Sequence, residues 1–464
     1  MQADDGTTFT TPPGGAWYPG KEMKRVWELI YSAVVIPLLW STLQVMGFVN
    51  RKIRKGIRAR YGLFASLEGQ VRSLSGAGRV WFHSSSLGEF EQAKPIIAEL
   101  KRRHPELTVI VTFFSPSGYE HSRKYHVADV ISYIPFDTRK NARRFLDLVK
   151  PDAAVMVRYD VWPNHIWELS RRRIPILIAN ATMRRQTSRR IPLIRSFHTR
   201  VYDPIDKILT VSATDAEAFS LFDLHHPVIE PIGDTRYDQV STRSAEARRR
   251  HIIPEHVVEN KLIVVAGSSW PEDESVLIPA FARLLESFTN LLLIIVPHEP
   301  TVEHIENLED QLDGTSSTIR FSGLNEYRNE RVIIVDSVGI LLTLYAYAHV
   351  AYVGGSFKQG VHNTLEAAVF GVPVLFGPRH RNSSEPLQLV NHGGAFVVND
   401  TQELYRTVFN LLENSGARES AGSRAADFVQ HNVGATERFL QHLSPYLSTP
   451  AAEVNRTSLF PERP

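Results

Sequence analysis

Two successive sets of apolar runs of strand length, each alternating with amphipathic helical patterns, constrain the fold of this 464-residue chain more than any other feature. Buried runs that alternate with helices indicate parallel sheets, and two sets indicate two Rossmann-like, doubly wound α/β domains that face a cleft. The first set lies at residues 79–83, 108–113, 130–134, 153–157, 174–179 and 207–211. The second set lies at residues 262–266, 291–296, 332–335, 350–353, 372–376 and 395–398.

A turn-rich stretch at residues 234–254 separates the two sets, so we expect the domains to join there. The chain is long enough for more than one domain. We predict a disordered N-terminus at 1–25, a membrane anchor helix at 26–50, Rossmann-like domains at 51–240 and 241–445, and a C-terminal tail at 446–464.

Residues 29–49 carry no charged side chain, and a helix of about 20 apolar residues can span a bilayer. The next ten residues, RKIRKGIRAR, are rich in basic side chains, which favours a cytoplasmic location for the rest of the chain and contact with anionic lipid. Trp27, Tyr31, Trp40 and Phe48 are suited to membrane interfaces. A helix that lies in the interface and a buried helix of the first domain are the alternatives.

The stretch 350–378 is the strongest candidate for a ligand site. It predicts a buried strand at 350–353, a glycine turn that ends in Ser356, a helix from about His362, and a second buried strand at 372–376. Backbone N–H groups of such a turn and the N-terminus of the helix suit a phosphate group.

Three polar side chains follow this glycine turn. His362, Asn363 and Glu366 are spaced to share one face of the predicted helix, close to the backbone of Gly355. A polar triad between two strands that are too apolar for the surface indicates ligand binding rather than packing alone.

The first strand of the N-terminal half ends in HSSSLGEF, with Gly88 and Glu89 at the turn into a helix. A carboxylate at the carboxyl edge of a parallel sheet faces the ligand crevice, where Glu89 is suited to take a proton from an attacking hydroxyl. The alternative is an acidic side chain that the helix dipole favours in a first turn. Arg158 and Asp160 follow another strand, either as ligand contacts or as a solvated ion pair.

Two further strand ends in the C-terminal half carry candidate ligand contacts. Ser268 lies in GSSWPEDE, where small residues suit contact with an anion, and His298 lies in VPHEP, where it faces a nucleotide or has a structural role.

Several classes of function lack their usual signals. The 52 basic and 50 acidic residues are nearly balanced, and basic residues are not interleaved with aromatics, so no nucleic-acid footprint is present. The absence of cysteine excludes disulfides and thiolate metal sites. Neither a phosphate loop nor a D-x-D or H-E-x-x-H metal motif occurs. No signal indicates an oligomeric state.

Taken together, these stretches resemble the 3-deoxy-D-manno-octulosonic acid (Kdo) transferases, membrane-associated glycosyltransferases of lipid A–core assembly with the two-domain GT-B architecture. The resemblance covers nearly the whole chain. It rests on RARYG after the apolar segment, HSSSLGEFEQAKPII, GDTRYD, GSSWPEDE, VPHEP and, most specifically, GGS followed by HN-x-x-E, a strand and GP.

The resemblance implies an N-terminal domain that binds a lipid A precursor and a C-terminal domain that binds CMP-Kdo. It implies inverting transfer by single displacement without a metal or cofactor, at the cytoplasmic side of the inner membrane, by a peripheral or single-pass protein. Glu89 matches the catalytic base, with Gly88 beside it. The donor contacts would be Ser268, His298, Gly355, Ser356, His362, Asn363 and Glu366, and the acceptor contacts Ser86, Arg158 and Asp160.

Three departures from the family pattern fall on presumed ligand loops. Glu-Thr-Glu is replaced by Arg158-Tyr159-Asp160, an Arg-His pair by His298-Glu299, and the proline after HN by Thr364. The alternative functions are another lipid-directed GT-B glycosyltransferase that uses a UDP-sugar, a nucleotide-sugar 2-epimerase on the same fold, and a non-catalytic membrane-tethered binding protein.

Overall fold

The computed structural model describes residues 21–74, 78–183, 191–381 and 383–447, and the chain forms two compact units. Unit 1 comprises Met1–Phe90, His104–Pro231 and Leu443–Pro464, and unit 2 comprises Glu91–Arg103 and Ile232–His442. The disorder predicted for residues 1–25 is wrong at 21–25, which begin the helix α1 (Lys21–Ile30), while residues 1–20 and most of the predicted tail fall outside the described residues.

Unit 1 is built on a parallel seven-stranded sheet in the order β3-β2-β1-β4-β5-β6-β7. Chain order departs from sheet order at β1, which pairs with both β2 and β4, so the carboxyl end of β1 lies at the switch point where α/β sheets bind ligands. The strands are β1 (Arg79–Ser84), β2 (Thr108–Phe113), β3 (Val130–Tyr133), β4 (Ala153–Val157), β5 (Ile176–Ala181), β6 (Lys207–Thr210) and β7 (Val228–Pro231).

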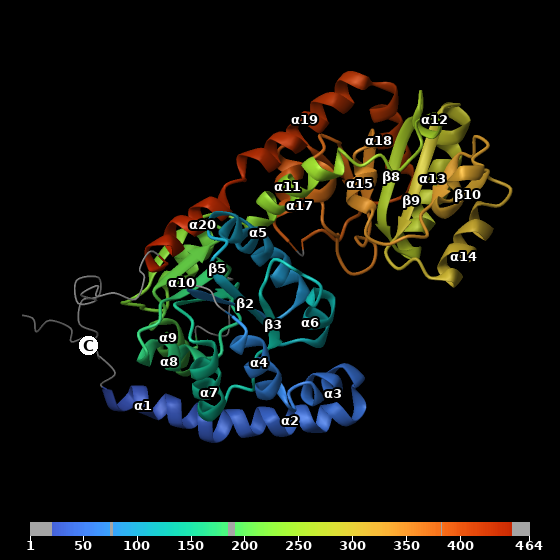
Figure 1. Ribbon diagram of the computed structural model, residues 1–464. Coiled ribbons are helices and arrows are strands. Elements are labelled where there is room, and N and C mark those ends of the chain that lie inside the picture. The colour runs from blue at the N-terminus through green and yellow to red at the C-terminus, as the bar shows by residue number, and fades with distance from the viewer. Residues whose placement is uncertain (1–20, 75–77, 184–190, 382, 448–464) are drawn as a thin grey trace, which may run out of the picture. The chain divides into compact units, whose positions relative to one another are not determined.

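Helices pack around this sheet (Figure 1). The apolar side chains between them are buried. Ser115, Thr138 and Ser212 each accept a backbone hydrogen bond at the start of a helix, which satisfies N–H groups that have no partner within the helix. The helices that follow strands are α5 (Leu87–Arg103), α6 (Pro116–Ser122), α7 (Arg139–Val149), α8 (Pro163–Arg171), α9 (Pro192–Tyr202) and α10 (Ala213–Ser220).

The N-terminal apolar segment forms one helical rod along unit 1, made of α1 (Lys21–Ile30), the π-helical turn η1 (Tyr31–Val35) and α2 (Ile36–Val49) (Figure 1). Residues Val26–Val49 are long and apolar enough to cross a membrane. The basic stretch that follows forms α3 (Arg51–Arg58), and α4 (Leu63–Arg72) leads to the sheet.

Unit 2 repeats the architecture with a parallel seven-stranded sheet in the order β10-β11-β9-β8-β12-β13-β14. Here β8 pairs with both β9 and β12, which gives a second switch point. The strands are β8 (Leu262–Ser269), β9 (Leu291–Pro297), β10 (Thr318–Arg320), β11 (Val332–Ile334), β12 (Val350–Val353), β13 (Val374–Phe376) and β14 (Ala395–Val397).

The first helix of unit 2 corrects the predicted join of the domains at residue 240. Tyr237, Val240 and Ala247 of α11 (Thr235–Ala247) lie in the hydrophobic core of unit 2, so the whole helix belongs to this unit. The other helices include α12 (Glu255–Val258), α13 (Pro271–Ser287), α14 (Val302–Leu312), α15 (Leu341–Tyr345), α16 (Leu365–Ala368), α17 (Glu385–Asn391), α18 (Thr401–Glu413), α19 (Ser415–His431) and α20 (Ala435–Leu443).

The two units confirm the predicted fold class, with two Rossmann-like sheets and an apolar N-terminal helix. The strands β7 and β10 were not predicted.

Candidate functional site

Glu89 lies in the first turn of α5, directly after the carboxyl end of β1. Its side chain folds back over the turn, where Oε2 accepts hydrogen bonds from the backbone N–H groups of Ser85 (2.6 Å) and Ser86 (3.3 Å). The residue is 8% exposed. These two bonds fix the buried carboxylate in one orientation.

A second carboxylate, Asp160, lies in the same cluster as Glu89. Asp160 Oδ2 accepts hydrogen bonds from the Trp162 indole N–H (3.1 Å) and the Ser85 hydroxyl, and lies 3.1 Å from His83 Nε2. His83 is fully buried, with Nδ1 2.9 Å from the Thr112 hydroxyl on β2. The ends of β1, β2 and β4 therefore converge on one hydrogen-bonded group.

The surroundings of Glu89 tune its basicity. Burial raises the pKa of the Glu89 carboxyl above its ordinary value, and the negative charge of Asp160 raises it further. The hydrogen bonds from Ser85 and Ser86 and the nearby His83 oppose this rise of the pKa. A carboxylate with a raised pKa is a stronger base, as proton abstraction from a hydroxyl requires.

The other residues predicted in unit 1 differ in how close they lie to this cluster. Ser86 contributes its backbone N–H to Glu89, and a Cβ added to Gly88 would have no atom within 4 Å, so the turn is open on that side. Arg158 has a φ of +63°, a strained conformation for a residue with a side chain. Its guanidinium lies 5.8 Å from the Tyr159 ring centre, and its buried Nε has no hydrogen-bond partner among the described residues.

In unit 2, the glycine turn after β12 is anchored by Asp273 at the start of α13. Asp273 is fully buried, and its Oδ2 accepts hydrogen bonds from the backbone N–H groups of Gly355 (2.8 Å) and Trp270 (3.0 Å). Its Oδ1 accepts a bond from the Tyr352 hydroxyl (2.8 Å). One carboxylate thus ties β12, the glycine turn and α13 together.

The turn brings two backbone segments into close approach. A Cβ on Gly354 would lie 2.2 Å from the Ser268 carbonyl oxygen, so this position accepts only glycine. Gly355 has a φ of +92°. Ser268 has a φ of +53° and lies in β8, at the point where the pairing of β8 with β9 shifts register between Gly267 and Ser269. Both predicted donor contacts therefore lie on irregular backbone at the carboxyl edge of the sheet.

Ser356 is fully buried, and its hydroxyl accepts a hydrogen bond from the Gly377 N–H at 2.6 Å. The Ser356 side chain therefore holds the glycine turn against the loop that follows β13.

The predicted helix from about His362 is wrong, because α16 begins at Leu365 and has four residues. His362 and Asn363 lie in the preceding loop, which the bond from His362 N–H to the Gly354 carbonyl (3.1 Å) draws back to the glycine turn. Asn363 Oδ1 then accepts a bond from the Leu365 N–H at 3.2 Å, which starts the helix. The three polar residues therefore do not share one helical face.

His362 instead joins a stack of rings. Its ring lies 4.3 Å from the exposed His298 ring at an interplanar angle of 12°, and His298 lies 4.7 Å from the Trp270 ring. The Trp270 indole N–H donates to His362 Nε2 (2.9 Å), and Lys358 Nζ lies 4.1 Å from the Trp270 ring centre. Burial and the nearby His298 lower the pKa of His362 to about 4, so its ring is neutral near pH 7 and accepts this bond.

Glu366 lies beside Asn363, to which it is hydrogen-bonded. Burial raises the pKa of Glu366, while Arg243 of α11, 3.8 Å away, lowers it. The structure thus brings Ser268, His298 and the residues from Gly355 to Glu366 to one edge of unit 2, and Ser86, Glu89 and Asp160 to one edge of unit 1.

No group of three or more His, Asp or Glu side chains within the described ranges is arranged to hold a metal ion. Metal-independent activity stays a prediction from the sequence.

Sequence reasoning missed four residues of these clusters: His83, Trp162, Trp270 and Asp273. All four lie in or beside motifs that were noted, but their roles depend on partners distant in the sequence, such as the Asp273–Gly355 bond. Each residue lies at or shortly after the carboxyl end of a strand, and this position was the signal that could have marked it as part of a ligand site.

Comparisons with known proteins agree across the chain. Residues 55–239 match the family model described as 3-Deoxy-D-manno-octulosonic-acid transferase (kdotransferase). A 3-deoxy-D-manno-octulosonic acid transferase of Haemophilus influenzae is 27% identical over 91% of this chain and 99% of its own length. One from Aquifex aeolicus is 29% identical over 72% of this chain and 86% of its own length.

A solved structure described as a putative UDP-N-acetylglucosamine 2-epimerase from Listeria monocytogenes has a TM-score of 0.56 at 12% identity, covering 81% of this chain and 99% of that chain. At this identity the likeness concerns the GT-B-like fold alone. The relatives that align along 72–91% of this chain are 3-deoxy-D-manno-octulosonic acid transferases, and the chain is similar to this family of glycosyltransferases over that length.

Proposed function

We propose that this protein transfers Kdo from CMP-Kdo to a lipid A precursor, lipid IVA, with Glu89 as the general base. The observation that carries the proposal is the buried Glu89 carboxylate with a raised pKa at the carboxyl end of β1. In the reaction, Glu89 takes the proton of the acceptor hydroxyl as its oxygen attacks the anomeric carbon. The bond between that carbon and the phosphate oxygen breaks, CMP leaves, and the configuration inverts.

Unit 2 would hold the nucleotide. The Gly355 N–H is bonded to Asp273, so we assign the phosphate to the Ser356 N–H of the glycine turn, because a fixed donor stabilises the charge that CMP gains as it leaves. We assign Glu366 and Asn363 to ribose hydroxyls, since a carboxylate beside an amide offers both acceptors and donors. The exposed ring of His298, stacked on the neutral ring of His362, is suited to pack against the base.

The acceptor and the location belong to the same proposal. The apolar helix supports attachment to the inner membrane with both units on the cytoplasmic side, where a lipid precursor is accessible. The strained Arg158, with its unpaired buried Nε, and Asp160 are suited to polar groups of the acceptor.

Replacing Glu89 by Gln tests the proposal. Gln keeps an oxygen to accept the Ser85 and Ser86 bonds but cannot take a proton, so we expect a loss of kcat of about 10²–10⁴-fold. The matched control is Glu99→Gln on α5, whose carboxylate pairs with Arg102 and Arg103 at the surface and should leave the rate unchanged. Near-normal transfer by a folded Glu89→Gln variant would refute this role.

Nucleotide binding distinguishes the alternative functions. A site for CMP-Kdo predicts that CMP raises the unfolding temperature of the protein and that UDP at the same concentration does not. Protection by UDP alone would favour a UDP-sugar glycosyltransferase or an epimerase.

A further inference from the structure

One face of the N-terminal helical rod is apolar and exposed. Leu38 and Val45 are each 67% exposed and Phe48 is 79% exposed, values far from those of a core helix. Exposed apolar side chains gathered in this number on one helix mark an interaction site. The exposed apolar side chains are Val26, Leu29, Ile30, Val34, Val35, Leu38, Val45, Met46, Phe48 and Val49.

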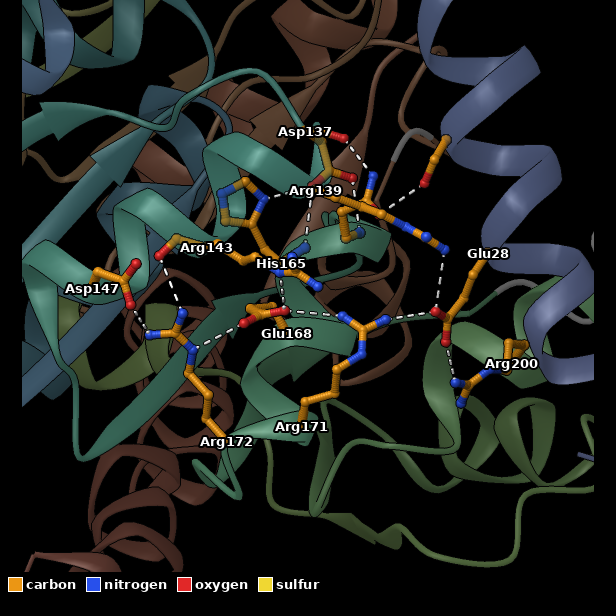
Figure 2. A network of polar contacts seen from close by, with 12 residues as sticks. Glu28, Asp137, Arg139, Arg143, Asp147, His165, Glu168, Arg171, Arg172 and Arg200 are labelled. Atoms are coloured by element: carbon orange, nitrogen blue, oxygen red, sulfur yellow. Dashed lines mark hydrogen bonds and ion pairs between the residues drawn. The ribbon is translucent and has the colours of Figure 1, made fainter.

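The opposite face of the rod is held to unit 1 by buried polar contacts. Glu28 accepts hydrogen bonds from Arg171 (2.5 Å), Arg139 (3.4 Å) and Arg200, which come from α8, α7 and α9. Figure 2 shows Glu28 reaching from the rod into this group of arginines. Glu28 is 8% exposed, so its charge depends on these partners for compensation.

The contacts of Glu28 continue into a wider network. Arg171 also bonds Glu168 (3.0 Å), which accepts a bond from Arg172 (3.1 Å), and Arg172 pairs with Asp147 (2.8 Å) (Figure 2). Removal of Glu28 would therefore leave its three arginine partners without the carboxylate that they share.

One helical turn later, Tyr31 and Ser32 make the next polar contacts. The Tyr31 hydroxyl donates to Asp137 (2.9 Å) and the Ser32 hydroxyl to Asn164 (3.1 Å). Asp137 is fully buried and also accepts bonds from the backbone and ring of His165. Detachment of the rod would break bonds to the interior of unit 1, not only to its surface.

Apolar packing extends the contact along the rod. Tyr31 and Ile36 are buried against Phe136 and Trp167, and Leu39, Trp40 and Leu43 pack on the same cluster. Trp27 donates to Ser196, so three aromatic residues predicted at a lipid interface, Trp27, Tyr31 and Trp40, contact the protein instead. The face held by unit 1 thus extends from Trp27 to Leu43.

The π-helical turn η1 keeps this face in register. Glu28 is buried before the turn, Tyr31 at its first residue, and Ile36 directly after it. A π turn adds one residue to the α-helical spacing, so Ile36 returns to the face of Glu28.

From this geometry we infer that the rod lies in the plane of the membrane, embedded in one leaflet of an anionic bilayer, and does not cross it. The inference rests on the membrane attachment in the proposed function and specifies its mode. A crossing helix would have to leave unit 1 and abandon the partners of Glu28, Tyr31 and Ser32. An in-plane helix keeps them while its free face enters the lipid, as amphipathic interfacial helices do.

Charge favours an anionic bilayer over a second copy of the chain as the occupant. The next helix, α3, begins at the end of the apolar face and exposes Arg51, Lys52, Lys55 and Arg58. Basic residues beside an apolar face attract anionic headgroups, by roughly five-fold in binding for each charge. Two copies packed through this face would bring like charges together.

Single spin labels test the orientation, because the chain contains no cysteine and each introduced thiol is unique. Leu29→Cys, Leu38→Cys and Val45→Cys place labels along the exposed face. The depth of each label in phosphatidylethanolamine–phosphatidylglycerol vesicles follows from its accessibility to a lipid-soluble relaxation agent compared with its accessibility to a water-soluble one. An in-plane rod predicts one common depth of about 5–10 Å. A crossing helix predicts a spread of up to about 24 Å between Leu29 and Val45, at about 1.5 Å per residue.

The possible results separate the two proposals. A depth gradient along the three labels with intact vesicle binding overturns the in-plane orientation but not membrane attachment. Absence of vesicle binding overturns both. Concentration-dependent dimerisation that protects the labels without lipid assigns the face to a second copy and also overturns the inference.

The Glu28 contacts provide a second measurement. In a Glu28→Gln background we expect the Leu29 label to leave the common depth while the Val45 label keeps it, because only the first part of the rod depends on the three arginines. The control is Glu68→Gln, which breaks a surface pair with Arg72 in unit 1 and should move neither label. Unchanged depth for Leu29 would refute the role given to Glu28.

Discussion

Asp273 offers a sharp test of how the glycine turn of unit 2 is held. Its carboxylate is fully buried and accepts three hydrogen bonds, from Gly355 N–H, Trp270 N–H and the Tyr352 hydroxyl. In Asp273→Ala the two N–H groups lose their acceptor, at about 1–3 kcal/mol each for buried groups. With the lost Tyr352 bond, we expect unit 2 to be destabilised by about 3–6 kcal/mol.

Asp273→Asn should be much milder. The amide oxygen can take the place of Oδ2 and keep both N–H bonds, while the amide NH₂ faces the Tyr352 hydroxyl. That hydroxyl can rotate to accept this bond and donate to Ser356, with which it is already hydrogen-bonded. Only the charge is lost, and since charged bonds are roughly twice as strong as neutral ones we expect a cost of about 1–2 kcal/mol.

Thermal unfolding followed by calorimetry measures the difference between the midpoints of the two variants. At about 2–4 °C per kcal/mol, the midpoint should fall by about 6–24 °C for Ala and by about 2–8 °C for Asn. The control is Glu272→Gln, an exposed neighbour on α13 that pairs with Lys358. Equal losses for Asn and Ala, or no loss for Ala, would refute the reasoning.

Three further predictions concern Glu89, His362 and Gly354. Transfer activity should fall as pH drops through the raised pKa of Glu89, and Asp160→Asn should move this acid limb to lower pH in a pH–rate profile, since it removes a charge that raises that pKa. His362 has a folded-state pKa of about 4, so between about pH 6.5 and 4 the unfolded chain binds a proton that the fold does not, and stability falls as pH drops. His362→Asn should remove about 1–2 kcal/mol of this loss, after allowance for partial exposure, in thermal unfolding from pH 7 to 4.5. Gly354→Ala should cost more than about 3 kcal/mol by its clash with the Ser268 carbonyl, whereas Gly69→Ala in α4, with open space around its Cβ, should not destabilise, as denaturant unfolding would measure.

The sheets were largely predictable from the sequence because their strands are continuous apolar runs. Every strand predicted from such a run is present, with ends within three residues. The missed strands β7 and β10 lie at the sheet edges, and their residues are exposed or half-buried. An edge strand without an apolar side gives no burial pattern to read.

The candidate sites were predictable only in part, for a related reason. Glu89 and Asp160 could be proposed because strand ends in parallel sheets converge at one edge. The start of α16 was missed because a bond between His362 and Gly354 holds the loop out of helical conformation. Asp273 holds the glycine turn through its bond to Gly355, which lies 82 residues away in the sequence. No local sequence pattern predicts such a pair.

The path of the chain has a consequence for dissecting the enzyme. The chain passes between the units four times, and Glu91–Arg103 counts with unit 2 although the chain around it belongs to unit 1. The Thr235 hydroxyl donates to the Gln92 carbonyl (2.6 Å), and Gln239 donates to Glu91 (2.6 Å), so α11 is bonded to this early segment. A fragment that begins at Ile232 keeps the whole second sheet but lacks the peptide to which its first helix is bonded. A fusion that links residues 91–103 to this fragment would preserve unit 2 better than the truncated fragment alone.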